Sequence, residues 1–273
     1  MKKFYLIVLL TFIVAFNFNI ALAENPGVKT KKEKATINFG ADLMSRYVWR
    51  GTEYGGNSPS IQPSLTLNSG GFTVGAWGAF STAGQNRSQE LDLFISQSFL
   101  KSLFTVTLTD YFFPVEWGDY NYFQYKSNVT GHVFEGNLTF NGVKDFPFTI
   151  MVATNFYGAD AFRINDNPQS SDFNSKKGIQ YSTYLELGYA FKVKDVSLNS
   201  FMGFNCTTPK KANTATGYIG EQGFYGDSFG IVNLGLTAHK SIAITEKYSL
   251  PLSASLITNP QAGKVYFVVG VSF

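Results

Sequence analysis

The chain ends with Lys264-Val265-Tyr266-Phe267-Val268-Val269-Gly270-Val271-Ser272-Phe273, which is the stretch with the strongest strand signal. Alternate residues from Val265 to Phe273 are apolar, and the other row includes Lys264, Tyr266, Gly270 and Ser272. A strand places successive side chains on opposite faces. One apolar and one mixed face suit the wall of a membrane β-barrel, which meets hydrocarbon outside and water inside. The same alternation is also found in an edge strand of a secreted β-sandwich, so other features must decide.

The beginning of the chain favours the barrel. Residues 1–23 start with Lys2 and Lys3, continue through an apolar run, and close on the small-residue cleavage site Ala21-Leu22-Ala23. This pattern predicts a cleaved secretory signal peptide, with a retained membrane anchor as the alternative. No later stretch has the ~18 consecutive apolar residues that a spanning helix needs. A membrane protein built from the remaining chain must therefore be a barrel, located in the bacterial outer membrane.

Composition agrees with one barrel domain. The 273 residues are 44% hydrophobic, 16% aromatic and 15% charged, and the mean hydropathy is −0.03. These values are expected where apolar and polar faces alternate. The net charge is only +3, and Lys2 and Lys3 contribute to it, so nothing indicates nucleic-acid binding. We expect a periplasmic tail over residues 24–35 and the barrel over residues 36–273.

Strand-like alternation recurs along the whole chain. Each segment has close to the ~10 residues that a tilted membrane strand needs. The connections alternate between short and long, as periplasmic turns and outer loops do in such barrels. The sequence therefore predicts an all-β fold, an antiparallel transmembrane β-barrel of about 12 strands, with 10 or 14 as alternatives. The predicted strands cover residues 36–50, 58–69, 71–81, 88–99, 102–113, 131–141, 145–157, 179–191, 194–206, 228–241, 247–258 and 263–273.

Charged side chains of the strands are assigned to the lumen, because the more apolar row of each strand must face lipid. Two interpretations of these charges stay open. They form a field that selects solutes, or they form salt bridges that brace or plug the interior. The candidate lumen or mouth residues are Asp42, Arg46, Arg50, Glu90, Asp92 and Glu186.

Two aromatic residues near the end of the first predicted strand have the opposite assignment. Tyr47 and Trp49 share the parity of Ile37, Phe39 and Leu43, which are expected to face lipid. Tyr and Trp are enriched where a membrane meets water. We therefore predict that Tyr47 and Trp49 belong to an aromatic girdle at the outer interface.

The first quarter of the chain resembles a known family. The motif is Ser45-Arg46-Tyr47-Val48-Trp49-Arg50-Gly51, followed by Pro59-Ser60-Ile61-Gln62-Pro63-Ser64-Leu65. It is similar to the Ser-x-Tyr-Val-(Trp/Phe)-Arg-Gly signature of the TorF-like porins, which are outer-membrane proteins. The resemblance implies a barrel and a porin function, and it brings no catalytic or ligand residues. The C-terminal Phe273 resembles the insertion signal of outer-membrane barrels, which implies the barrel-assembly machinery as a partner.

We expect a porin-like channel for passive diffusion of small hydrophilic solutes, surrounded by outer-membrane lipid. A barrel of about 12 strands leaves a narrow lumen at most, because ~8 strands enclose a filled interior and ~16 a wide channel. The alternative is a structural or adhesive barrel that acts through its outer loops. Aromatic residues of the loop 114–130 either stack on a sugar or nucleoside ring or belong to the girdle. They are Trp117, Tyr120, Tyr122, Phe123 and Tyr125.

Catalysis and metal binding are not expected. Only His132 and His239 are available as imidazole bases, and neither lies in a recognised catalytic motif, so a lipid hydrolase is the least favoured function. The two histidines and Cys206 lie far apart, without the spacing of a metal site. We therefore expect no metal, no cofactor and no nucleic-acid partner.

Overall fold

The computed structural model describes residues 34–83, 89–114, 121–127 and 129–273. The predicted signal peptide and most of the predicted tail lie outside the described residues, as do Trp117 and Tyr120. All strands belong to the unit formed by residues 35–273. Across the described ranges, no helix is both long and apolar enough to cross a membrane.

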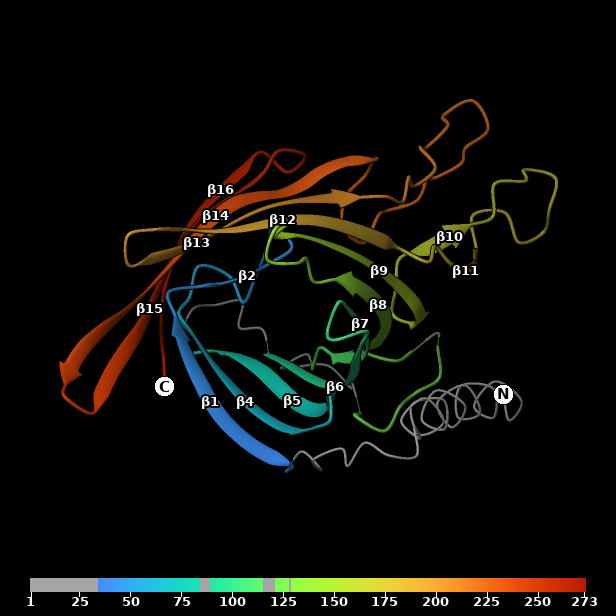
Figure 1. Ribbon diagram of the computed structural model, residues 1–273. Helices are drawn as coiled ribbons and strands as arrows, with labels where there is room; N and C mark the ends of the chain where they lie inside the picture. Colours follow the sequence, from blue (N-terminus) through green and yellow to red (C-terminus); the bar gives the residue numbers. More distant parts are fainter. Residues whose placement is uncertain (1–33, 84–88, 115–120, 128) are drawn as a thin grey trace. The chain divides into compact units, whose positions relative to one another are not determined.

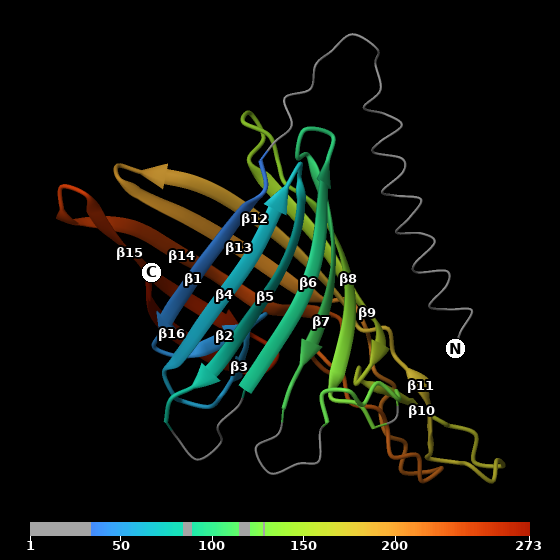
Figure 2. The ribbon, with the colours of Figure 1, turned by 90° about the horizontal axis from the view of Figure 1, so that it is seen from below.

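Twelve antiparallel strands close into a barrel within the described part of the chain (Figures 1 and 2). Each barrel strand pairs with its neighbours along the chain, and β1 pairs with β16 to complete the ring. The predicted all-β class, the antiparallel barrel and the strand number are confirmed. The strands are β1 (Thr36–Met44), β4 (Ser60–Ser69), β5 (Phe72–Ser81), β6 (Gln89–Phe99), β7 (Phe104–Phe112), β8 (His132–Phe140), β9 (Phe148–Gly158), β12 (Thr183–Val193), β13 (Val196–Asn205), β14 (Gly230–Thr245), β15 (Tyr248–Asn259) and β16 (Lys264–Ser272).

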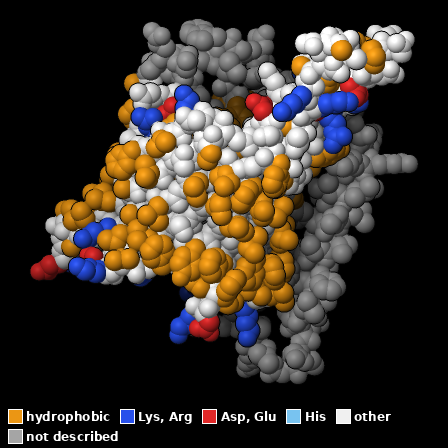
Figure 3. All heavy atoms as spheres, turned by 90° about the horizontal axis from the view of Figure 1, so that it is seen from above, with side chains coloured by type: hydrophobic (Ala, Val, Ile, Leu, Met, Phe, Trp, Pro, Cys, Tyr) orange, Lys and Arg blue, Asp and Glu red, His pale blue; other side chains and the backbone are white. Residues whose placement is uncertain are grey.

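The two faces of the wall differ in chemistry. Apolar side chains on one row are exposed, with Phe39 at 79% and Phe267 at 64%. Figure 3 shows hydrophobic side chains gathered into a broad area on one face of the molecule, with charged side chains at its margins. The opposite row carries buried polar groups, among them Gln62 of β4 and Asn233 of β14. Because side chains alternate along a strand, the exposed apolar row faces outward and the polar row lines the interior.

A short seam between the first and last strands closes the barrel. β1 pairs with β4 along all nine residues from Thr36 to Met44. It pairs with β16 only through Asp42 with Ser272, Leu43 with Val271, and Met44 with Gly270. The backbone N–H of Phe273 also donates to the carbonyl oxygen of Ala41 at 3.0 Å. The C-terminal residue thus extends the seam.

The first predicted strand is too long. The alternation predicts a strand that continues to residue 50, but β1 ends at Met44, and the backbone N–H of the next residue, Ser45, donates to the Val269 carbonyl at 2.8 Å. Residues 47–54 instead form a separate hairpin of β2 (Tyr47–Trp49) and β3 (Thr52–Tyr54). A second small hairpin, β10 (Phe162–Ile164) with β11 (Lys176–Ile179), lies in the connection between β9 and β12.

A disulfide across the seam tests barrel closure. In a Cys206→Ser background, we expect Leu43→Cys combined with Val271→Cys to form an intramolecular disulfide, because these residues are direct cross-strand partners. Non-reducing gel electrophoresis of the unfolded protein would show the faster-migrating looped chain.

The matched control combines Leu43→Cys with Phe267→Cys. Phe267 comes four residues before Val271 in β16, so its Cα atom lies about 13 Å along the strand from the position opposite Leu43. This exceeds the ~7 Å limit between the Cα atoms of a disulfide. Equal cross-linking of both pairs, or none in the first, would contradict the closed register.

Candidate functional site

The β2–β3 hairpin folds back into the interior of the barrel, where Figure 1 shows β2 inside the ring of strands. Three successive side chains of β2 reach three parts of the wall. Each of these three side chains makes an aromatic or apolar contact with a different part of the wall. The hairpin therefore crosses the lumen and does not lie along one strand. The contacts are Tyr47 with Trp77 of β5, Val48 with the cluster of Ile257, Tyr266 and Val268 on β15 and β16, and Trp49 with Tyr111 of β7.

The tip of the hairpin is a two-residue turn with an unusual backbone. Arg50 has a φ of 48° and Gly51 a φ of 77°. Two successive positive values are those of the type I′ turn, which suits a tight hairpin but is uncommon for a residue other than Gly or Asn. Gly51 is required by its surroundings as well, because an added Cβ would lie 1.9 Å from the carbonyl oxygen of Val232. Asn259 donates from its side chain to the Gly51 carbonyl at 3.2 Å.

The turn directs the Arg50 side chain at a buried carboxylate. Glu135 of β8 is 1% exposed and accepts two hydrogen bonds from the guanidinium, one of them from Nη2 to Oε1 at 2.9 Å. Tyr111 donates to Oε1 at 3.1 Å, and Tyr225 donates to Oε2 at 3.0 Å. Four donors therefore surround this carboxylate. Such full pairing is what makes a buried charge tolerable in a protein interior.

Aromatic rings complete the surroundings of the guanidinium. The Cζ atom of Arg50 lies 4.5 Å from the ring centroid of Trp49, 4.6 Å from that of Tyr184 and 5.3 Å from that of Tyr225. Cation–π attraction is strongest where water is excluded. Tyr225 comes from the long connection between β13 and β14, so this loop also enters the interior.

Tyr47 and Trp49 lie elsewhere than predicted. The parity argument placed them in an outward aromatic girdle, but Tyr47 is 7% exposed and both contact inward-facing residues of the wall. The reason is that the strand ends at Met44, so the parity of β1 no longer applies beyond it. An aromatic hairpin gains more from burial against other rings than from exposure to solvent.

Arg46 fixes the base of the hairpin. Its Nη1 donates to Oε1 of Glu53 at 2.8 Å, and its Nη2 donates to Oδ1 of Asn57 at 2.6 Å. The side chain is 27% exposed, so solvent weakens this ion pair. The predicted pair of basic mouth residues therefore has two structural roles, Arg46 at the base and Arg50 at the tip.

Glu90 and Asp92 lie on the inward row at the start of β6. They are 1% and 6% exposed. Both carboxylate oxygens of Glu90 and Oδ1 of Asp92 lack a hydrogen-bond partner among the described residues. Neither group forms an ion pair with Arg50 or with any other described residue.

The two other predicted lumen residues also lie along the wall. Glu186 of β12 accepts hydrogen bonds from the hydroxyl of Tyr184 and from Asn233 Nδ2, the latter at 3.2 Å. Asp42 of β1 lies opposite Gln62 in the register of the sheet. Neither forms an ion pair among the described residues.

Sequence reasoning missed the partners of Arg50. Glu135 was one of many acidic residues in predicted strands, and Tyr225 lies in a loop without a motif. The only signal for Glu135 was its parity with Asn137 and Thr139 in an otherwise apolar strand. No sequence signal indicates Tyr225, because the path of a long loop depends on tertiary contacts.

His132 has a structural environment. It is fully buried on the row opposite to Glu135, with Nδ1 at 2.7 Å from Oδ1 of Asp110 and Nε2 at 2.6 Å from the carbonyl oxygen of Tyr122. Both ring nitrogens are thus engaged, and they tie the connection between β7 and β8 to the wall. The ring of Tyr125 packs against the imidazole in a tilted arrangement, with 4.4 Å between the ring centroids. His239 is exposed on β14.

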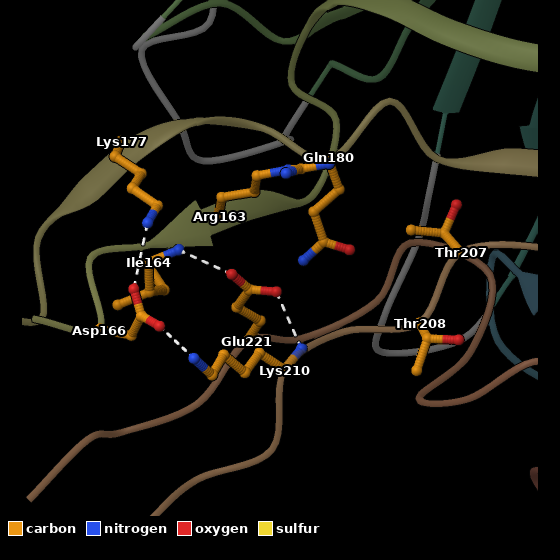
Figure 4. Close-up of a pocket in the computed structure, with 9 residues that line it drawn as sticks. All are labelled: Arg163, Ile164, Asp166, Lys177, Gln180, Thr207, Thr208, Lys210 and Glu221. Atoms are coloured by element: carbon orange, nitrogen blue, oxygen red, sulfur yellow. Dashed lines mark hydrogen bonds and ion pairs between the residues drawn. The ribbon is translucent and has the colours of Figure 1, made fainter. Parts of the chain in front are cut away.

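A polar cleft of about 270 Å³ lies between the β10–β11 hairpin and the connection between β13 and β14 (Figure 4). Asp166 accepts hydrogen bonds there from Lys177, at 3.2 Å, and from Lys210. The Lys210 ammonium is the main cause that lowers the pKa of the Asp166 carboxyl to about 2, and Lys177 adds to the effect. The carboxylate therefore stays charged at any physiological pH.

In the described ranges, no group of three or more His, Cys, Asp or Glu side chains is arranged to hold a metal ion. The model of a bacterial protein family of unknown function, Gcw_chp, matches residues 29–231, and the chain belongs to this family. The match includes the hairpin, Glu135 and Tyr225, and it ends within β14. No curated protein matches the chain.

A double-mutant cycle tests the buried ion pair. We expect Arg50→Met to destabilise the folded barrel by about 3–5 kcal/mol, because it leaves the Glu135 charge buried without its partner. Adding Glu135→Gln should recover most of this loss, since the amide keeps the shape without the charge. Urea-induced unfolding, followed by the mobility shift between folded and unfolded protein, measures both effects. Additive losses would show that Arg50 and Glu135 do not interact.

Proposed function

We propose that this protein is a porin-like channel of the bacterial outer membrane, in which small hydrophilic solutes diffuse passively through the barrel. In this proposal the apolar outer face contacts outer-membrane lipid, and residues 1–23 are the cleaved export signal. Phe273 is proposed to mark the chain for the barrel-assembly machinery. We infer a transport role rather than catalysis.

The observation that carries the proposal is the opposite chemistry of the two faces of a closed wall. An exposed apolar row and a buried polar interior are the arrangement that lipid outside and water inside require. A soluble barrel would bury its apolar row. The resemblance of residues 45–51 to the TorF-like porins supports the same function.

The interior explains why the proposed solutes are small. About 12 strands already restrict the lumen, and the β2–β3 hairpin with Tyr225 occupies part of it. Glu90 and Asp92 add two buried carboxyl groups that form no ion pair with any described residue. We therefore propose a narrow channel for small solutes.

A second candidate function uses the long loops. The β10–β11 hairpin projects from the end of the barrel that carries the long connections (Figure 2), and it lines the polar cleft. The ordered surface of this hairpin and cleft favours a barrel that binds partners through its loops, in a structural or adhesive role.

Removing the hairpin tests the channel. Met44 and Ser60 are direct cross-strand partners, so replacing residues 45–59 with Asn-Gly closes a two-residue turn between them. The same variant carries Glu135→Gln, because the hairpin would no longer supply Arg50. We expect a several-fold larger single-channel conductance in a planar bilayer than for the wild type, since the obstacle in the lumen is gone.

The matched control replaces residues 214–217 with Asn-Gly, which shortens an exposed loop between the paired Asn213 and Tyr218. Its conductance should equal that of the wild type. If both shortened proteins fold, but neither they nor the wild type conduct, the channel function is wrong. Binding through the loops then becomes the leading candidate function.

A further inference from the structure

The cleft near the β10–β11 hairpin is held in a fixed shape by contacts between two distant loops. The side chain of Asn174 donates to the Gly217 carbonyl at 3.0 Å and accepts from the Ile219 N–H at 3.0 Å. The backbone N–H of Ile164 donates to Oε1 of Glu221 at 3.1 Å. Binding in such a preformed cleft avoids the entropy cost of ordering its walls.

The charge that the cleft offers to a ligand is positive. Asp166 already accepts from Lys177 and Lys210, and Glu221 accepts from the backbone N–H groups of Ile164 and Lys210. Both carboxylates are therefore engaged. Arg163 forms no ion pair with any described residue, although it lines the same cleft. Its guanidinium has the planar donor geometry that matches phosphate.

Neutral polar groups line the other sides of the cleft. Gln180 is 4% exposed, and its Nε2 donates to the carbonyl oxygens of Phe162 and Gln222. Its Oε1 is buried without a partner in the described part of the chain. Figure 4 shows Arg163 and Gln180 on one side of the cleft and Thr207 and Thr208 on another. Hydroxyl and amide groups of this kind pair with the hydroxyls of a sugar.

We propose that this cleft binds a phosphorylated sugar. Arg163 holds the phosphate, while Thr208 and Gln180 contact sugar hydroxyls. The volume of about 270 Å³ lies just below the ~300–1,000 Å³ typical of sites for drug-sized ligands, which fits a single small sugar unit. The ligand is a soluble sugar phosphate or the phosphorylated sugar headgroup of a lipopolysaccharide. The site lies in the loops, so it does not depend on conduction through the lumen.

Isothermal titration calorimetry on the full chain, purified in detergent, tests the site with two probes. Glucose 1-phosphate represents the soluble source, and lipopolysaccharide micelles represent the lipid source. We expect saturable binding of at least one probe, weakened about tenfold or more by Arg163→Gln, because a charge-assisted hydrogen bond is lost. Thr208→Val should weaken the same binding. Glucose without phosphate should bind far more weakly.

The matched control is Lys211→Gln, which removes one positive charge from the same loop at a residue that does not line the cleft. It should leave the affinity unchanged. Binding of glucose 1-phosphate identifies the soluble source, and binding of the micelles alone identifies the lipid source. The proposal is overturned if neither probe binds, if Arg163→Gln binds as tightly as the wild type, or if Lys211→Gln causes an equal loss.

Discussion

The buried ion pair between Arg50 and Glu135 is the constraint on which the interior of this barrel depends. A carboxylate that stays charged at 1% exposure needs a cation and further donors, and among the described residues of the wall only Tyr111 donates to Glu135. The cation comes from a hairpin that must cross the lumen to reach it. The positive φ values at Arg50 and Gly51 follow from this requirement, because only a tight turn places the guanidinium at the tip.

One long loop connects this interior with the outer cleft. The connection between β13 and β14 supplies Tyr225, whose hydroxyl accepts from Arg50 and donates to Glu135. The same loop supplies Lys210 and Glu221, which hold the β10–β11 hairpin. Interior packing and the shape of the cleft therefore share a structural element. The backbone of this loop therefore directly connects the packing around Tyr225 with the walls of the cleft.

Much of the fold followed from the sequence because a two-residue period is a strong local signal. The strand positions, the alternation of short and long connections and the inward position of Glu90, Asp92 and Glu186 all rest on that period. It stopped being informative at Met44, where the chain turns inward although Tyr47 and Trp49 continue the alternation. Parity says which residues share a face only while the strand continues. The partners of Arg50 come from β7, β8 and a loop, and pairings over such separations are tertiary choices that one sequence does not encode locally.

Hydrogen–deuterium exchange of the hairpin tests the central claim most directly. The account predicts that peptides covering residues 46–57 exchange nearly as slowly as wall peptides from β5 and β16, because the hairpin is packed inside the barrel by Arg50, Tyr47 and Trp49. The exposed loop residues 211–217 serve as the fast reference in the same experiment. Exchange of the hairpin as fast as this reference would contradict the account, because it would show a hairpin outside the lumen and a Glu135 without its cation.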